Sequence, residues 1–213
     1  MKRKNPPAHR RNRILRRPWA ALLATAALLV TAAPPAVADG AEAFIRSTAD
    51  RVFTSYAEEV TDEQRATAFR DILTATFELR TIARFTLGRY WRVASSDQRK
   101  EYRRLFEDFL VLAYANRFRD LGGVKLRVTS VVTISKRDQL VQSEVDPGSG
   151  RPPIRIGWRV RETRHGYRIV DVIVDGISMS VTQRDQFAAA IRSSGGKVDG
   201  LLAMLRDKTG PRQ

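Results

Sequence analysis

The apolar residues of this chain repeat with two different periods, and the change between them lies near Gly122-Gly123. Before that point, apolar side chains recur at the spacing of one helix face. From Val124 to Val174 they alternate with polar residues, which is the spacing of one strand face. Beyond Val174 the helical spacing returns. Because helices and strands occupy separate stretches, the pattern predicts an α+β fold.

Capping signals divide the first helical part. A helix is predicted over residues 41–59. Thr61 to Gln64 and Ser95 to Gln98 are capping boxes, in which a hydroxyl caps the new helix and a glutamine reaches back. A short helix over residues 79–87 is expected to end at Gly88, because glycine tolerates the left-handed conformation of a helix end. The longest helix is predicted over residues 96–119.

Four strands are predicted in the second part, at about 124–134, 140–145, 154–161 and 167–174. Because turns join consecutive strands, they imply an antiparallel meander, and one face of such a sheet must be covered. The flanking helices can cover it.

Two further helices are predicted after the strands. Thr182 is expected to cap the first, Gly195-Gly196 to end it, and Asp199 to cap the second. The tail of residues 209–213 is expected to be disordered.

Residues 1–38 have the pattern of an export signal. A basic stretch without acids precedes an Ala- and Leu-rich run from Trp19 to Ala33, then Pro34-Pro35, and then Ala36-Val37-Ala38, a small-x-small cleavage site. A membrane-spanning helix needs about 20 apolar residues, so this run favours a cleaved signal over an anchor. The arginine pairs lack the apolar pattern that follows them in twin-arginine signals, which favours general secretion. We therefore expect a periplasmic protein that begins near residue 39.

Charge and cysteine content narrow the function classes. The formal net charge is +15, but eight of the 38 basic residues lie in the predicted signal. Residues 39–213 carry 30 basic and 23 acidic side chains, a net of +7. An exported basic protein suits anionic headgroups or an acidic partner better than nucleic acid. Because the sequence contains no cysteine, disulfides and thiolate metal sites are excluded.

No set of residues has the pattern of a catalytic or metal site. The histidines are His9, in the predicted signal, and His165, at a predicted turn. Asp171 and Asp175 lie four residues apart on one predicted strand, and paired carboxylates can serve acid–base chemistry. The alternative is that Asp171 accepts local hydrogen bonds and Asp175 begins the turn at Gly176. We favour the alternative.

Several segments resemble the MlaC (toluene-tolerance) family of periplasmic lipid-binding proteins. They are Leu87 to Arg99 (LGRYWRVASSDQR), Asp171 to Met179 (DVIVDGISM), Arg184 to Phe187, and Val198 to Leu201 followed by Leu205. Asp175 stands where the family often has Glu, and either acid fits that turn. The resemblance runs from about Ala43 to Lys208, so residues 39–208 are expected to form one lipid-binding domain.

The resemblance implies a fold and a function. The fold is a twisted four-stranded antiparallel sheet packed against N- and C-terminal helices, with an apolar cleft between them. The function is that of a carrier that shields a phospholipid and maintains outer-membrane lipid asymmetry. The implied partners are an inner-membrane ABC transporter complex with an MCE-type subunit and an outer-membrane lipoprotein–porin complex. Bound lipid is the cargo, and no enzyme activity, cofactor or metal is implied.

The candidate lining residues are aromatic or aliphatic and lie on or beside the predicted inward faces. Filling of an ordinary core is the alternative for each, and the resemblance favours the cleft. They are Phe53, Phe85, Tyr90, Trp91, Phe106, Phe109, Tyr114, Val128, Val132, Ile156, Trp158, Val160, Val172, Val174, Ile177, Met179 and Phe187.

A second candidate set is basic. Arg89 and Arg92 flank Tyr90-Trp91, and Arg155, Arg159 and Arg161 alternate along one strand. Guanidinium groups can bind two oxygens of a phosphate or carboxylate at once, so these residues are candidates for a rim that meets a headgroup or an acidic partner. A solvated basic face is the alternative.

Three other functions remain open from the sequence. The cargo could be a hopanoid or another polycyclic lipid. A small enzyme could use Asp171 and Asp175 in the same cleft, although the scarcity of His and the lack of Cys argue against it. The protein could also be an adaptor whose cleft is filled by its own side chains.

Overall fold

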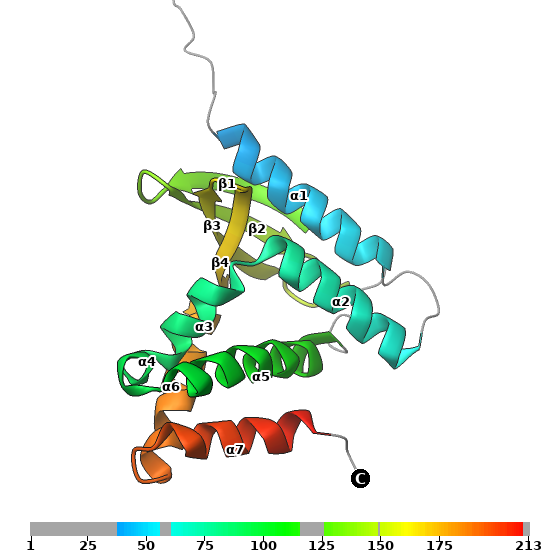
Figure 1. The fold of residues 1–213 in the computed structure, drawn as a ribbon. Coiled ribbons are helices and arrows are strands. Elements are labelled where there is room, and N and C mark those ends of the chain that lie inside the picture. Colours follow the sequence, from blue (N-terminus) through cyan, green and yellow to red (C-terminus); the bar gives the residue numbers. More distant parts are fainter. Residues whose placement is uncertain (1–37, 56–60, 116–125, 149, 211–213) are drawn as a thin grey trace, which may run out of the picture. The chain divides into compact units, whose positions relative to one another are not determined.

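The computed structural model describes residues 38–55, 61–115, 126–148 and 150–210. The helices and strands of this part are shown in Figure 1. They are α1 (Ala38–Ser55), α2 (Asp62–Thr76), α3 (Leu79–Leu87), α4 (Tyr90–Val93), α5 (Ser96–Tyr114), β1 (Leu126–Thr133), β2 (Asp138–Val145), β3 (Ile154–Thr163), β4 (Gly166–Val174), β5 (Ile177–Ser178), α6 (Met179–Ser193) and α7 (Val198–Thr209). All of the predicted signal except Ala38, together with Gly122-Gly123, lies outside the described residues.

Both predicted capping boxes are confirmed. The Thr61 hydroxyl accepts from the Gln64 backbone N at 3.2 Å, and the Gln64 side chain accepts from the Thr61 backbone N at 2.9 Å. Ser95 and Gln98 form the same reciprocal pair at 3.1 and 2.9 Å. The predicted short helix is also confirmed as α3, and Gly88 ends it with a φ of 57°. Local sequence therefore sets the starts of α2 and α5 and the end of α3.

The predicted caps of the last two helices are wrong. Helix α6 begins earlier, because the Ser178 hydroxyl caps it by accepting from the Val181 backbone N at 3.1 Å. Thr182 lies inside the first turn and donates back to the Ser178 carbonyl. Helix α7 begins after Lys197, and Asp199 lies in its first turn, where it accepts from Gln98 at 2.7 Å. An earlier hydroxyl, that of Ser178, thus caps α6, and the Asp199 side chain bonds to a residue of α5 instead of capping α7.

The strands form one antiparallel sheet in the order β1-β2-β3-β4-β5. The predicted meander is confirmed, but the number of four strands is wrong, because the two residues of β5 add a fifth. Asp175 and Gly176 join β4 to β5, and their φ values of 48° and 85° are both in the left-handed region. Such a two-residue turn reverses the chain at once, so pairing resumes directly at Ile177.

Strand β1 contains an irregularity that changes which side chains share a face. Pairing with β2 shifts between Val128 and Ser130, so that one extra residue is accommodated. Beyond it, Val131 pairs with Val141, and Val132 falls on the other face and is 52% exposed. The expectation that Val128 and Val132 share an inward face is therefore wrong, because simple alternation ignores the extra residue.

The described residues form three hydrophobic clusters. The sheet cluster joins α1 to β2, β3 and β4; the helical cluster joins α3, α4, α5, α6 and α7; and the third joins α2 to α5. Phe77, between α2 and α3, packs against all three. Its backbone bridges to Ile169 of β4, and the Glu78 backbone N donates to the Ile169 carbonyl at 2.9 Å. Phe77 therefore marks the junction between the sheet and the helices.

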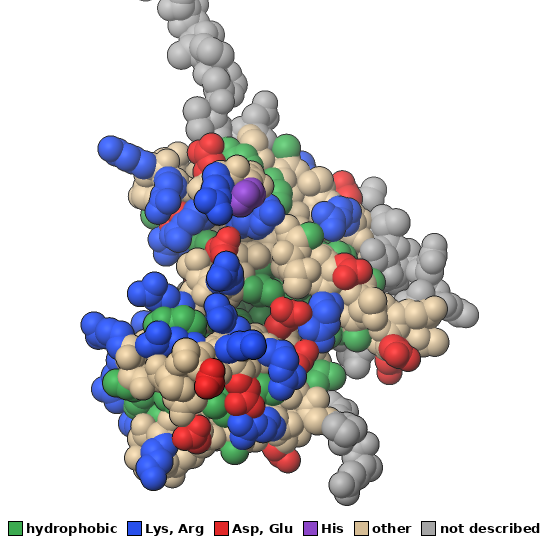
Figure 2. All heavy atoms as spheres, viewed as in Figure 1, with side chains coloured by type: hydrophobic (Ala, Val, Ile, Leu, Met, Phe, Trp, Pro, Cys, Tyr) green, Lys and Arg blue, Asp and Glu red, His purple; other side chains and the backbone are tan. Residues whose placement is uncertain are grey.

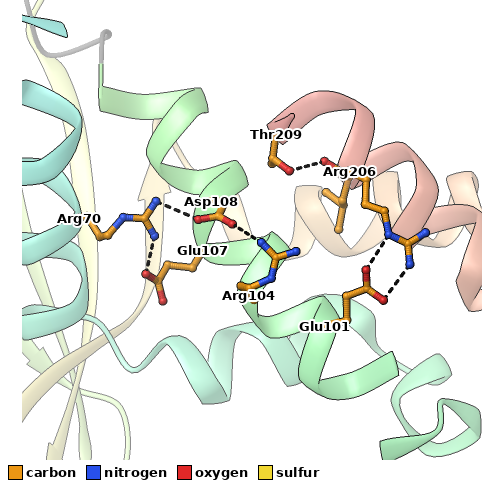
Figure 3. A network of polar contacts seen from close by, with 8 residues as sticks. Arg70, Glu101, Arg104, Glu107, Asp108, Arg206 and Thr209 are labelled. Carbon is orange, nitrogen blue, oxygen red and sulfur yellow. Dashed lines mark hydrogen bonds and ion pairs between the residues drawn. The ribbon is translucent and has the colours of Figure 1, made fainter. Parts of the chain in front are cut away.

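Ion pairs connect α5 to the helices on both sides of it (Figure 3). Arg70 of α2 donates to Glu107 at 2.7 Å and to Asp108 at 2.9 Å. Arg206 of α7 donates to both carboxylate oxygens of Glu101, at 2.6 and 2.8 Å. Helix α5 is thus tied to α2 and to α7 by arginine forks.

Candidate functional site

The inner face of the sheet is defined here as the face on which α1 packs. Ala41 and Ile45 of α1 form the sheet cluster with Val141, Val160 and Ile169, and none of the five is more than 1% exposed. Val160 was a predicted lining residue, and it lies in this closed contact with α1. A charge at Val160 would therefore disturb the core, so other positions must be used to probe the surface of the sheet.

Cross-strand pairing places several predicted lining residues on this inner face, because directly opposed residues lie on the same side of a sheet. Val128 opposes Ser143, which opposes Ile156, which opposes Val174. In the next row, Val141 opposes Trp158, which opposes Val172. Ile177 opposes Val174. The predicted residues on the inner face are Val128, Ile156, Trp158, Val160, Val172, Val174 and Ile177.

Four of these residues form a half-buried surface that we call the apolar strip: Ile156, Trp158, Val172 and Val174. Trp158 and Val172 lie at the edge of the sheet cluster, whereas Ile156 and Val174 belong to none of the three clusters of the described residues. The apolar surface of the inner face therefore extends past the residues that α1 covers.

Hydrogen bonds hold the Trp158 ring in the strip. Its indole N–H donates to the Ser143 hydroxyl at 2.9 Å, and that hydroxyl donates to the Ile156 carbonyl at 3.1 Å. Because its polar atom has a partner, the indole can present an apolar surface without an unpaired donor. Ser143 is itself buried, so the short chain of bonds is shielded from water.

Five aromatic residues of the helices that were predicted to line the cleft lie either inside the helical cluster or at its edge. Tyr90, Phe106 and Phe187 are buried in the helical cluster, and the rings of Phe106 and Phe187 meet edge to face with centroids 6.1 Å apart. Trp91 and Phe109 lie at the edge of that cluster and are partly buried. The first three therefore fill a core, which is the alternative that the sequence left open for each of them.

The remaining predicted lining residues are scattered. Phe85 is 41% exposed and lies under the Arg184 guanidinium, 5.1 Å from its ring centroid, so its expected inward position is wrong. Tyr114 lies at the edge of the cluster between α2 and α5, and Met179 is half-buried at the start of α6. The side chain of Phe53 lies outside the described residues.

Two residues that sequence reasoning did not select lie where the clusters meet. Phe77 contacts all three clusters, and Leu110 of α5 contacts both the helical cluster and the one between α2 and α5. Phe77 follows the end of α2 and has extended backbone angles, so it belongs to no periodic stripe. The one sequence feature that could have identified Phe77 is that it is an aromatic residue between two helices.

The basic residues of β3 share the outer face of the sheet, as predicted, but two of them are held by a carboxylate. Asp138 is buried. Its Oδ2 accepts from Arg159 at 2.7 and 3.0 Å and from Arg161 at 2.8 Å, and its Oδ1 accepts from Arg161 at 2.7 Å. These bonds, chiefly the one from Arg161, lower the pKa of Asp138 to about 2 against the cost of burial. Arg155 is largely exposed, with Asp175 at 3.8 Å. Two of the three β3 arginines predicted for the rim are therefore already paired within the protein, and the rim itself stays a prediction.

Arg89 and Arg92 are exposed at α4, on a different element from the apolar strip. Arg89 donates to the Tyr90 hydroxyl at 3.0 Å. Neither side chain forms an ion pair with a described carboxylate. Their position fits the expectation that they are available to a partner.

Asp171 and Asp175 have separate structural tasks. Asp171 accepts from the Val172 and Ser180 backbone N atoms at 2.9 and 3.1 Å and from the Ser178 hydroxyl at 2.6 Å, so it fastens the end of β4 to the start of α6. Asp175 forms the left-handed turn and accepts from the Arg155 backbone N at 3.3 Å. These bonds are of the kind that the structural alternative predicts.

The described residues contain no group of three or more His, Cys, Asp or Glu side chains that could hold a metal ion. None of the described helices is long and apolar enough to cross a membrane. A pocket of about 260 Å³ lies between the end of α3 and the middle of α6, and one of about 50 Å³ lies at the β1–β2 hairpin. Neither is lined by the apolar strip, which is thus a surface rather than part of either pocket.

Two comparisons with known proteins agree with this architecture. A family model described as "MlaC protein" matches residues 46–207. Among solved structures, a phospholipid-binding protein from Ralstonia solanacearum, solved in complex with a phospholipid, is similar with a TM-score of 0.72. It is 20% identical in sequence, and the match covers 79% of this chain and 96% of that one. At this identity the likeness concerns the fold.

Proposed function

Because this chain belongs to the MlaC family, we propose that it is a periplasmic carrier that shields the acyl chains of a phospholipid against the inner face of its sheet. The apolar strip carries this proposal. Its four side chains face the same way as the core, yet they are only half-buried. The phospholipid in the structurally similar Ralstonia protein supports the choice of cargo.

The energetics of the cargo favour direct transfer between proteins. Each buried CH₂ contributes about 0.8 kcal/mol, so two long acyl chains amount to roughly 20 kcal/mol before the costs of binding. That is near the practical limit of non-covalent affinity, at roughly 18–21 kcal/mol, so release into water would be very slow. The carrier would therefore exchange lipid while docked. The proposed donors and acceptors are an inner-membrane ABC transporter complex with an MCE-type subunit and an outer-membrane lipoprotein–porin complex.

Access to the strip requires space between the sheet and the helices. The sheet cluster and the helical cluster are separate and are linked through Phe77, rather than fused into one core. Separate cores can move apart at lower cost than a single interdigitated core, which resists deformation. We propose that acyl chains enter between these two clusters.

Native mass spectrometry of residues 39–213, purified without detergent from an export-competent host, tests the proposal. A bound mass equal to a diacyl phospholipid is expected, and its fragments would identify the headgroup. A bound mass equal to a polycyclic lipid such as a hopanoid would support a carrier function with a different cargo. Protein free of lipid, both from this host and from the native source, would contradict the proposal and favour an adaptor.

A pair of neighbouring substitutions tests the surface itself. Ile156→Glu places a charge in the apolar strip, whereas Arg155→Glu places one on the exposed outer face of the same strand. The first should lose bound lipid and the second should retain it. Ile156→Trp, which occupies space without burying a charge, should also lower lipid content. Folded Ile156 variants with full lipid content would refute this assignment.

A further inference from the structure

Positive charge is concentrated between α3 and the middle of α5. Residues 79–106 contain eight basic and two acidic side chains, a net of +6. Residues 39–213 as a whole have a net of +7, so this segment accounts for nearly all of the excess. Within the described part of the chain, Arg104 is the member of this set that forms an ion pair, with Asp108 at 3.1 Å. Arg99 donates to the Trp91 and Arg92 carbonyls and lies over the Trp91 ring, so it is held within the protein.

A pocket of about 260 Å³ lies within this charged region, with Gly88, Arg89 and Tyr90 on one side and Arg184 and Asp185 of α6 on the other. Gly88 has a φ of 57°, which an L side chain would adopt only under strain. The Arg184 stem crosses it, 3.5 Å from the point where a Cβ would stand. That spacing is an ordinary van der Waals contact, so the backbone conformation and not the approach of α6 is what favours glycine here.

The two guanidinium groups keep most of their hydrogen-bonding capacity. Arg89 makes one bond, to the Tyr90 hydroxyl at 3.0 Å. Arg184 lies over the Phe85 ring and is 3.5 Å from Asp185, and both partners of this ion pair are exposed. An exposed pair of this kind contributes little and is readily exchanged. Each guanidinium has five N–H donors, and both residues line the same pocket, so each keeps donors for an incoming carboxylate.

Exposed apolar side chains border the pocket. Phe85 is 41% exposed, and Val181, one turn before Arg184 on α6, is 38% exposed. We call the surface formed by Phe85, Gly88, Arg89, Val181 and Arg184 the Gly88 corner. Figure 2 shows hydrophobic and basic side chains intermingled in the region of α3 and α4. Aromatic and arginine side chains are the types enriched in protein–protein interfaces.

We propose that the Gly88 corner is the docking surface for an acidic protein partner, with an Asp or Glu side chain of that partner in the pocket between Arg89 and Arg184. The proposal rests on the carrier function, because a carrier that exchanges lipid while docked needs such a surface. A carboxylate matches the forked donors of guanidinium. A protruding side chain fits a concave pocket, whereas a flat bilayer surface would not fill it.

The test uses the soluble domain of the MCE-type subunit from the same organism as the probe, immobilised for biolayer interferometry. Arg184→Glu, alone and combined with Arg89→Glu, should weaken binding at least about tenfold, because like charges across an interface are repulsive. Lys136→Glu and Arg164→Glu make the same change of charge at the exposed hairpin tips. These controls should alter the affinity less than about twofold, since exposed charges separated by more than about 8–10 Å are largely screened at physiological salt.

A second readout separates docking from cargo binding. Arg184→Glu should retain its phospholipid in native mass spectrometry, because Arg184 does not belong to the apolar strip. Equal affinities of Arg184→Glu and the hairpin controls would overturn the docking assignment, as would the absence of binding by the unmodified protein at low salt. Weakened binding to phosphatidylglycerol vesicles with unchanged binding to the subunit would assign the corner to a membrane instead. The absence of bound lipid in the unmodified protein would contradict the carrier function itself.

Discussion

At the scale of single residues, Asp138 shows how the fold uses a buried charge. Its side chain is 4% exposed and accepts hydrogen bonds from two arginines of the adjacent strand β3. The pKa of about 2 lies below the ordinary value of 3.8, so the folded state favours the ionised form. The stabilisation is therefore fully present above the pKa of the unfolded chain and is lost as pH falls from about 4 towards 2.

Asp138→Asn should lower the free energy of unfolding at pH 7 by about 2 kcal/mol, which corresponds to the difference in pKa between the two states. Urea titrations at a series of pH values measure this. The difference between the variant and the original protein should shrink below pH 4, because protonation removes the same charge. A difference that stays constant down to pH 2 would show that the effect comes from packing and not from ionisation.

At the scale of elements, the irregularity in β1 decides which valine contributes to the core. Val131 packs against the sheet cluster, whereas Val132 pairs with Leu140 on the outer face and is 52% exposed. Two adjacent residues of the same type thus lie in opposite environments, as a strand requires. Alternation counted from Val128 assigns them the wrong way round.

Val131→Glu should therefore destabilise the protein by about 1–3 kcal/mol, because it buries a polar group without a partner. Val132→Glu should change the stability by less than about 0.5 kcal/mol, as is usual at an exposed site. Thermal or chemical unfolding of both variants provides the comparison, and each serves as the control for the other. The reverse order of stability would mean that the strand is regular.

Among the helices, the ion pairs of Arg70 between α2 and α5 provide a test (Figure 3). Its fork to Glu107 and Asp108 connects α2 to α5, which also share the third hydrophobic cluster. In the absence of lipid, the Arg70→Met variant should still fold. Its free energy of unfolding should be lower by about 1 kcal/mol, because the ion pairs are partly exposed. Hydrogen exchange in α2 should become faster.

Arg206→Met removes the matching fork to Glu101 between α5 and α7. Those helices share the large helical cluster, whereas α2 and α5 share the smaller third cluster, so exchange in α7 should change less than exchange in α2. Equal acceleration of exchange in both variants would show that the forks have the same structural weight and that α2 is no easier to release than α7.

At the scale of the whole described molecule, the separation of the hydrophobic clusters has a thermodynamic consequence. An apolar strip that is half-buried contributes less to folding than a filled core, because stabilisation scales with the apolar area removed from water. Cargo that covers the strip would supply the missing burial. Stability and lipid content should therefore be coupled.

Delipidated protein should unfold at a lower temperature than the loaded form. A ligand at a hundredfold excess over its Kd stabilises the folded state by about 2.7 kcal/mol, which for a domain of this size raises Tm by about 5–10 °C. Differential scanning calorimetry before and after reloading with phospholipid measures the shift. Ile156→Glu should show none, and a full shift in that variant would place the lipid elsewhere.

The sequence by itself determined the elements whose signals are local. The capping boxes at Thr61 and Ser95 need residues only three positions apart, and the end of α3 needs one glycine with a positive φ. The meander follows from short turns between consecutive strands. The family was recognisable from motifs such as Leu87 to Arg99, and the family model confirms it.

Only the tertiary structure decided how side chains from distant elements are paired. The extra residue in β1 places Val132 on the outer face of the sheet. Asp138 forms ion pairs with Arg159 and Arg161 of β3. Phe77 packs against all three hydrophobic clusters. Neither the aromatic content nor the alternation of apolar residues distinguishes a filled core from an open apolar surface, because a core and such a surface use the same residues at the same spacing. That difference depends on which element covers which part of the sheet, and coverage is a property of packing over long sequence distances.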